Sequence, residues 1–194
     1  MKTKYLLLVI AIAFFLSCNV PNTKISDEVY ISHIKKGDEI TNLAQATLLG
    51  NVSNAMQKGG PSYAIEFCNL SASTLIDSLS RLNNCVISRV SEKNRNPENN
   101  LKSEPEKKIW KLMQTKLNID TLIQDNQSLV YYKSIKIALP ACLKCHGVEK
   151  TDISPATLEK INQLYPRDLA TGYQLNDFRG LWKVEFKTNE MNGR

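Results

Sequence analysis

The stretch WKVEFK at residues 182–187 alternates large apolar side chains with charged ones. Successive side chains of a β-strand point to opposite faces of a sheet, so this alternation predicts a strand with one buried and one solvated face. Residues 86–91 and 129–138 also have strand length and are rich in β-branched and aromatic residues. We expect these strands to pair antiparallel.

Helical patterns surround these strands. Two apolar stripes at helical spacing, separated by Gly59-Gly60-Pro61, predict two helices in series, the second of which turns Cys68 toward the core. A third helix is expected at about residues 105–117, where Ser103 and Glu106 have the spacing of a capping box. This order indicates an α+β fold, an antiparallel sheet flanked by helices with an N-terminal helical pair. The residues expected to be buried are Ile40, Leu43, Ala44, Leu48, Val52 and Met56 in the first helix, Ala64, Ile65, Cys68, Ala72, Leu75, Ile76 and Leu79 in the second, and Ile109, Trp110, Leu112 and Met113 in the third.

Length and composition fit one globular domain, which we expect at residues 27–190. The chain has 194 residues, of which 42% are apolar and 23% charged. This balance is neither that of a disordered chain nor that of a polytopic membrane protein. The net charge is +6, and the chain has no basic run. We therefore expect no nucleic-acid partner.

The N-terminal segment resembles a bacterial export signal. Lys2 and Lys4 precede an uninterrupted apolar run that is short for a membrane span, and the following Leu16-Ser17-Cys18 resembles the lipobox of bacterial lipoproteins. We expect residues 1–17 to be removed and residues 18–26 to serve as a tether. Lipidated Cys18 would then anchor the protein on the periplasmic side of a bacterial membrane. The alternative is a simple cleaved signal that leaves Cys18 as an unmodified thiol.

The run Cys142-Leu143-Lys144-Cys145-His146 is a C-x-x-C-H motif, the attachment sequence of c-type haem. In such a site the two thiols bind the haem vinyl groups as thioethers, and the adjacent imidazole becomes the proximal iron ligand. We predict one covalent haem on Cys142 and Cys145, with His146 on the iron. The alternatives are a thioredoxin-like dithiol, a disulfide and half of a zinc site. The first lacks its fold pattern, and the last lacks a second cysteine pair or paired histidines.

Three blocks of sequence extend the pattern around this motif. They are Ala64-Ile65-Glu66-Phe67-Cys68, the segment from Arg89 through Ser91 and Lys93 to Arg95-Asn96-Pro97-Glu98-Asn99, and Cys142 to Gly147 followed by Tyr165-Pro166-Arg167-Asp168-Leu169-Ala170-Thr171-Gly172-Tyr173 and Arg179-Gly180. Together they resemble a family of single-haem c-type domains of unknown function that are likened to PAS-type sensory domains. The resemblance implies a PAS-like fold and departs from the family pattern at residues 101–105 and at Asn176, where glycine is usual. Asparagine tolerates the left-handed turn conformation that glycine adopts.

The sixth position of the iron has several candidate ligands. Cys68 lies on a core-facing helical stripe, and the resemblance implies that this cysteine can face the iron. A thiolate there would favour ferric iron and lower the reduction potential relative to a methionine ligand. Alternatively, Cys68 packs in the core or forms a disulfide with Cys85, and Met56 or Met113 is the ligand. His33 precedes the well-formed helices, so we do not expect bis-histidine ligation.

Two arginines and three later residues are candidates for the haem pocket. Arg89 and Arg95 could each bind a haem propionate, because the planar guanidinium forms a fork that matches a carboxylate. For Arg95 the alternative is a pairing with a surface acid beside a turn. Tyr165, Asp168 and Tyr173 follow the haem motif closely enough to wall the pocket. We expect these three to act mainly through structure, with Asp168 as a helix or turn cap.

Two classes of function remain. We favour a membrane-anchored electron-transfer cytochrome, and the alternative is a haem-based redox or gas sensor that signals to a protein partner. We do not expect an enzyme, because no second motif supplies a general base, a nucleophile or a substrate pocket of recognisable spacing. The chain ends at Arg194, soon after the last predicted strand and without a kinase segment, which favours electron transfer.

Replacing Cys18 with serine tests the lipid anchor. We expect the variant to move from the membrane fraction to the soluble periplasmic fraction, because acyl chains provide the attachment and the mature sequence has no apolar run long enough to span a bilayer. Cell fractionation with immunoblotting measures the change. Persistent membrane association of the variant would indicate attachment through a protein partner instead.

Overall fold

The computed structural model describes residues 25–116, 119–125 and 128–187 and has the predicted α+β architecture. The predicted signal segment, Cys18 and most of the tether lie outside these residues, as do residues 188–190 at the end of the predicted domain. Ser26, the last tether residue, accepts a hydrogen bond from the Val29 amide and so caps the first helix. None of the described helices is apolar enough over a sufficient length to cross a bilayer.

The sheet contains the three predicted strands and one that was not predicted. Its antiparallel strands lie in the order β1-β4-β3-β2, where β1 is Cys85–Val90, β4 is Phe178–Phe186, β3 is Ser128–Lys136 and β2 is Asp120–Asp125. The WKVEFK stretch belongs to β4, which pairs on both sides. Strand β2 escaped prediction because it is a short edge strand with aspartate at both ends, a residue that strands usually avoid.

The three predicted helices are present, and α4 and α5 are two further helices that were not predicted. Helix α1 is Asp27–Leu70, and Gly59 and Gly60 are non-helical within it, so it consists of two helices in series with the break at the predicted place. Helix α2, Ala72–Leu82, is separated from α1 by Ser71, which divides the helix predicted to continue from Pro61. Helix α3 is Glu104–Thr115, η1 is the short 3-10 turn Pro97–Asn99, and the helices α4, Pro140–His146, and α5, Pro155–Leu164, follow β3.

The capping box at the start of α3 is present but shifted by one residue. The Ser103 hydroxyl accepts a hydrogen bond from the Glu106 amide at 3.3 Å, and the Glu106 carboxylate accepts one from the Lys102 amide at 2.6 Å. The left-handed conformation expected of Asn176 is confirmed by its φ of 69°. These local signals correctly predicted the backbone at both positions.

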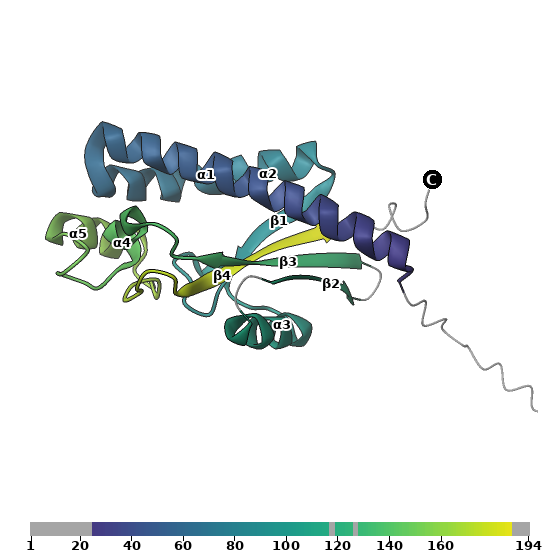
Figure 1. Cartoon of the computed structure of the whole chain (residues 1–194). Helices are drawn as coiled ribbons and strands as arrows, with labels where there is room; N and C mark the ends of the chain where they lie inside the picture. Colours follow the sequence, from purple (N-terminus) through teal and green to yellow (C-terminus); the bar gives the residue numbers. More distant parts are fainter. Residues whose placement is uncertain (1–24, 117–118, 126–127, 188–194) are drawn as a thin grey trace, which may run out of the picture.

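Helices cover both faces of the sheet, as Figure 1 shows. Helices α1 and α2 pack on one face and α3 packs on the other, while α4 and α5 lie together at one end. The first face contributes Ile87, Leu122, Leu129, Tyr131, Trp182, Val184 and Phe186 to the core, and the second contributes Val90, Val130, Tyr132 and Leu181.

The prediction of a solvated face on β4 is wrong where α3 covers it. Lys183 is half-buried there and donates to the buried Glu106 carboxylate at 3.0 Å. Two residues predicted to be buried are also exposed, Leu43 to 46% and Leu112 to 39%. Each lies at the margin of the apolar stripe of its helix, and the spacing of apolar residues does not show where the buried face ends.

Helix α1 crosses the sheet most closely at Gly37. A β-carbon at this position would lie 2.6 Å from a ring carbon of Tyr131, which is fully buried and donates its hydroxyl to Asp120 at 2.9 Å. The absence of a side chain therefore sets how closely α1 approaches β3. Gly50 on the same helix has nothing within 4 Å of such a β-carbon.

Alanine at these two glycines should have opposite effects on stability. Gly37→Ala should lower the free energy of unfolding by about 1–3 kcal/mol, because it forces the helix or the Tyr131 ring to move. Gly50→Ala should raise it by up to about 1 kcal/mol, because alanine is the better helix former. Urea unfolding measures both changes. Equal effects of the two substitutions would contradict the close approach at Gly37.

Candidate haem site

A cavity of about 630 Å³ lies between the end of the sheet and the helices α1, α2 and α4. Its volume is typical of a site for a cofactor-sized ligand. Cys142, Cys145 and His146 line it from α4, and Cys68 lines it from α1. The structure thus brings all the predicted haem and iron ligands to one cavity, although Cys68 is far from the others in the sequence.

The two motif cysteines lie on a short helix that Pro140 opens. Residues three positions apart share a helix face, so Cys142 and Cys145 point in similar directions. Burial raises the pKa of the Cys145 thiol to about 11, so it is a neutral thiol at physiological pH.

The disulfide alternative is not formed in this structure, because Cys142 and Cys145 are both free cysteines. Within residues 25–116, 119–125 and 128–187, no three histidine, cysteine, aspartate or glutamate side chains gather closely enough to hold a metal ion by themselves. A complete zinc site among these residues would need such a group, whereas half of a site would not.

His146 has the orientation and the protonation state that an iron ligand requires. Its Nδ1 lies 2.8 Å from the carbonyl oxygen of Ala170. A carbonyl only accepts, so Nδ1 carries the proton and Nε2 retains its lone pair for a metal. Burial, assisted by the positive charges of Arg95 and Arg179, holds the pKa of His146 well below its usual value. The imidazole is therefore neutral, as metal binding demands.

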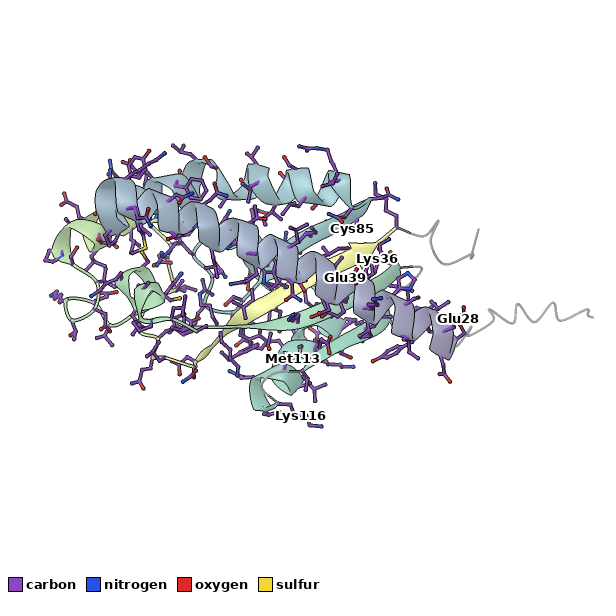
Figure 2. The ribbon with its side chains drawn as sticks, turned by 45° about the horizontal axis from the view of Figure 1, so that its top comes forward. Glu28, Lys36, Glu39, Cys85, Met113 and Lys116 are labelled. Atoms are coloured by element: carbon purple, nitrogen blue, oxygen red, sulfur yellow. The ribbon has the colours of Figure 1, made fainter. Side chains whose placement is uncertain are left out.

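Cys68 faces the cavity near the end of α1, as predicted. Burial raises the pKa of its thiol, and the charges of Arg89 and Arg95 oppose this effect in part. The disulfide with Cys85 is not formed. Cys85 is buried at the start of β1, and Figure 2 shows it away from the end of the sheet that carries α4 and α5.

The positions of the other candidate ligands decide which of them can reach the cavity. Met56 lines the cavity and remains compatible with ligation. Met113 is a fully buried residue of α3 in the core on the opposite face of the sheet, so it is not a ligand for this cavity (Figure 2). His33 packs edge-on against Phe186 at 4.9 Å, at the far end of β4, which agrees with the expectation against bis-histidine ligation.

Arg95 pairs with a buried acid rather than a surface acid. Its Nε and Nη2 atoms donate to the two Asp168 carboxylate oxygens at 3.0 and 3.1 Å, and the two side chains are only 10% and 6% exposed. Asp168 therefore occupies the fork of Arg95 that was predicted for a propionate. Asp168 also accepts from the Ala170 amide at 3.1 Å, which confirms the predicted turn cap.

Arg89 and Arg179 are two of the four arginines that line the cavity. Arg89 packs over the ring of Trp182 at 5.7 Å, and Arg179 donates to the Ser91 hydroxyl and the Lys93 carbonyl, both at 3.0 Å. Neither forms an ion pair with a described acidic residue. Burial lowers the pKa of both groups, and buried cations of this kind favour an anionic ligand in the cavity they line.

Two features of the site were not predicted as functional. Arg179 lies within the third sequence block, but no role followed from its position. Ala170 acts through its backbone carbonyl, which no side-chain pattern reveals.

Of the three residues expected to wall the pocket, only Tyr165 lines the cavity. Tyr173 packs against the His146 ring, and Asp168 binds Arg95 behind the wall.

Comparisons with known proteins agree with the fold. The family described as Tll0287-like matches residues 23–186, so the chain belongs to this family. Among solved structures, the chain is similar to that reported as "Crystal structure of the cyanobacterial heme-protein Tll0287", with a TM-score of 0.62 and 20% sequence identity. The superposition covers 79% of this chain and 93% of the other. No curated protein matches the sequence.

The buried neutral His146 should make the haem-free chain sensitive to acid. Its pKa in the folded chain lies below the ordinary value of 6.5 that the unfolded chain restores, so the unfolded state binds the proton more readily. Stability should therefore fall as the pH drops below about 6.5. Urea unfolding of a Cys142→Ala/Cys145→Ala variant at about pH 7.5 and pH 5.5 measures this loss. Adding His146→Gln should reduce the loss, and an equal loss in both chains would contradict the assignment.

Proposed function

We propose that the protein is a c-type cytochrome that binds one haem covalently and transfers electrons outside the cytoplasm. The observation that carries the proposal is the convergence of Cys142, Cys145, His146 and Cys68 on one cavity, with Nε2 of His146 available to a metal. The similar solved structure is named as a heme-protein, which supports haem as the ligand. A bound haem would supply a one-electron ferric/ferrous couple.

Each ligand residue has a separate task in this proposal. Cys142 and Cys145 would hold the haem covalently, each through a thioether bond made by adding its thiol to a vinyl group. His146 would bind the iron through Nε2, and Cys68 would supply a sulfur ligand.

The arginines offer binding partners for the propionates. Arg89 and Arg179 line the cavity and make no ion pair with an acid of the described chain, so their charges are available for two carboxylates. Arg89 was predicted for this role and Arg179 was not. Trp182, beneath the Arg89 guanidinium, limits where that group can move.

Attachment to a membrane completes the proposal. Cys18 carries the lipid, and residues 18–26 connect it to α1 on the periplasmic side of the membrane. The support for this part is the lipobox resemblance and the extracytoplasmic assembly that covalent haem requires. We propose no enzymatic activity, and we expect the physiological partner to be a redox protein.

A haem-based sensor is the second candidate, and the position of Cys68 favours it. The helical segment that carries Cys68 lies between the break at Gly59-Gly60 and the interruption at Ser71. Such a segment could move and release its ligand while the rest of α1 stays in place. An exchangeable ligand would open the iron to a gas and make the protein a sensor.

Covalent attachment is tested by expression with a haem c maturation system. We expect one haem per chain that acid–acetone extraction leaves on the polypeptide. Cys142→Ala or Cys145→Ala should weaken retention, and the double substitution should abolish it, because each removes a thioether. Cys85→Ala is the matched control and should retain the haem fully, since Cys85 lies in the core. A haem-free chain with a Cys142–Cys145 disulfide after maturation would refute the proposal.

Cys68→Ala tests the sixth ligand. We expect intact thioethers, a changed ferric spin state and a higher reduction potential, because an anionic ligand is lost. Met56→Leu should leave the spectrum unchanged. If Met56→Leu alters the spectrum and Cys68→Ala does not, Met56 is the ligand.

Carbon monoxide binding to the ferrous wild-type protein separates the two functions. A fixed sixth ligand should give slow or absent binding together with rapid electron exchange with small mediators, as electron transfer requires. Rapid binding would show that the ligand leaves and would favour the sensor. Stopped-flow spectroscopy measures both rates.

A further inference from the structure

The ion pair between Arg95 and Asp168 lies directly behind the proximal histidine. Besides binding Asp168, Nη2 of Arg95 donates to the carbonyl oxygen of Cys145 at 2.7 Å and approaches that of Ala170 at 3.5 Å. Asp168 accepts from the Ala170 amide. The pair therefore connects the end of α4 to the peptide whose carbonyl accepts the His146 proton.

Other hydrogen bonds hold this loop, but they do not reach the Ala170 peptide. Lys93 donates to the Thr171 carbonyl at 2.7 Å, and the Gly172 and Tyr173 amides donate to carbonyls at the end of α4. Ala170 itself is fully buried; its amide donates to Asp168, and its carbonyl accepts from Nη2 of Arg95. The position of its carbonyl thus depends on the ion pair.

We propose that Arg95 and Asp168 are positioning residues that hold the Ala170 carbonyl against Nδ1 of His146 and thereby lower the reduction potential of the haem iron. This inference rests on the proposed function. A strong hydrogen bond at Nδ1 makes the imidazole a better electron donor through Nε2, and a better donor stabilises ferric over ferrous iron. Weakening the bond should therefore raise the potential.

The sign of the change distinguishes positioning from simple charge. Loss of the Asp168 charge alone would raise the potential, because a negative charge near the iron favours the ferric state. Loss of the Arg95 charge alone would lower it. Loss of positioning raises the reduction potential whether Asp168 or Arg95 is replaced. The two explanations therefore predict opposite signs for Arg95→Gln.

The experiment compares holo-protein variants by redox titration after acid–acetone extraction has confirmed covalent haem. In the double variant Arg95→Gln/Asp168→Asn the two charge changes cancel. We expect the ferric-to-ferrous ratio at a fixed ambient potential to fall about tenfold, which corresponds to a rise of about 59 mV for one electron. Arg95→Gln should shift in the same direction. Glu98→Gln, a carboxylate-to-amide control at an 82% exposed side chain in the same segment, should not shift.

Hydrogen exchange at Nδ1 of His146, followed by nuclear magnetic resonance, gives a second readout. We expect faster exchange in the Arg95 and Asp168 variants than in Glu98→Gln. A lower or unchanged potential in Arg95→Gln with unchanged exchange would overturn the inference. If that variant does not fold, Arg95→Lys decides by the same criteria, because it keeps the charge and loses the fork. Absence of haem from the wild-type protein would instead refute the proposed function.

Discussion

The pairing of β4 with a neighbour on each side is the constraint on which the rest of the structure depends. Its hydrogen bonds to β1 and β3 place it in the middle of the sheet, between the two helical layers. The register sets Trp182 directly opposite Arg89, so both side chains reach the cavity on the same face. A β-carbon on Gly180 would lie 2.9 Å from the Val90 carbonyl, and this close approach leaves no room for a larger residue.

The arginine charges around the cavity favour an anionic ligand. Four arginines line it, and among the described residues only Asp168 forms an ion pair with one of them. Removing charged groups from water costs free energy that an opposite charge can return. An anionic ligand would therefore stabilise the folded chain as well as bind to it, because binding to the folded state alone shifts the folding equilibrium.

Local sequence patterns predicted most of the fold and several of the residues that line the cavity, and contacts between distant residues were not predicted. The C-x-x-C-H motif, the break at Gly59-Gly60 and the alternation in β4 are each encoded within a few residues. The ion pair of Arg95 and Asp168 joins positions 73 residues apart, so it exists only once the chain is folded. Helix α5 had a readable signal, since Ser154 precedes Pro155 and caps the Thr157 amide.

The length of α1 determines how far from an attachment point before this helix the cavity would meet its partners. The part of this helix before Gly59 rises about 1.5 Å per residue and forms an arm of roughly 48 Å. Figure 1 shows that the arm starts at one end of the molecule and that α4 and α5 lie at the other. If the molecule is attached by the segment before α1, this arm acts as a rigid radius that has the attachment point at one end and the cavity toward the other. The area within which it meets partners would then grow with the square of that radius, without any lengthening of the tether.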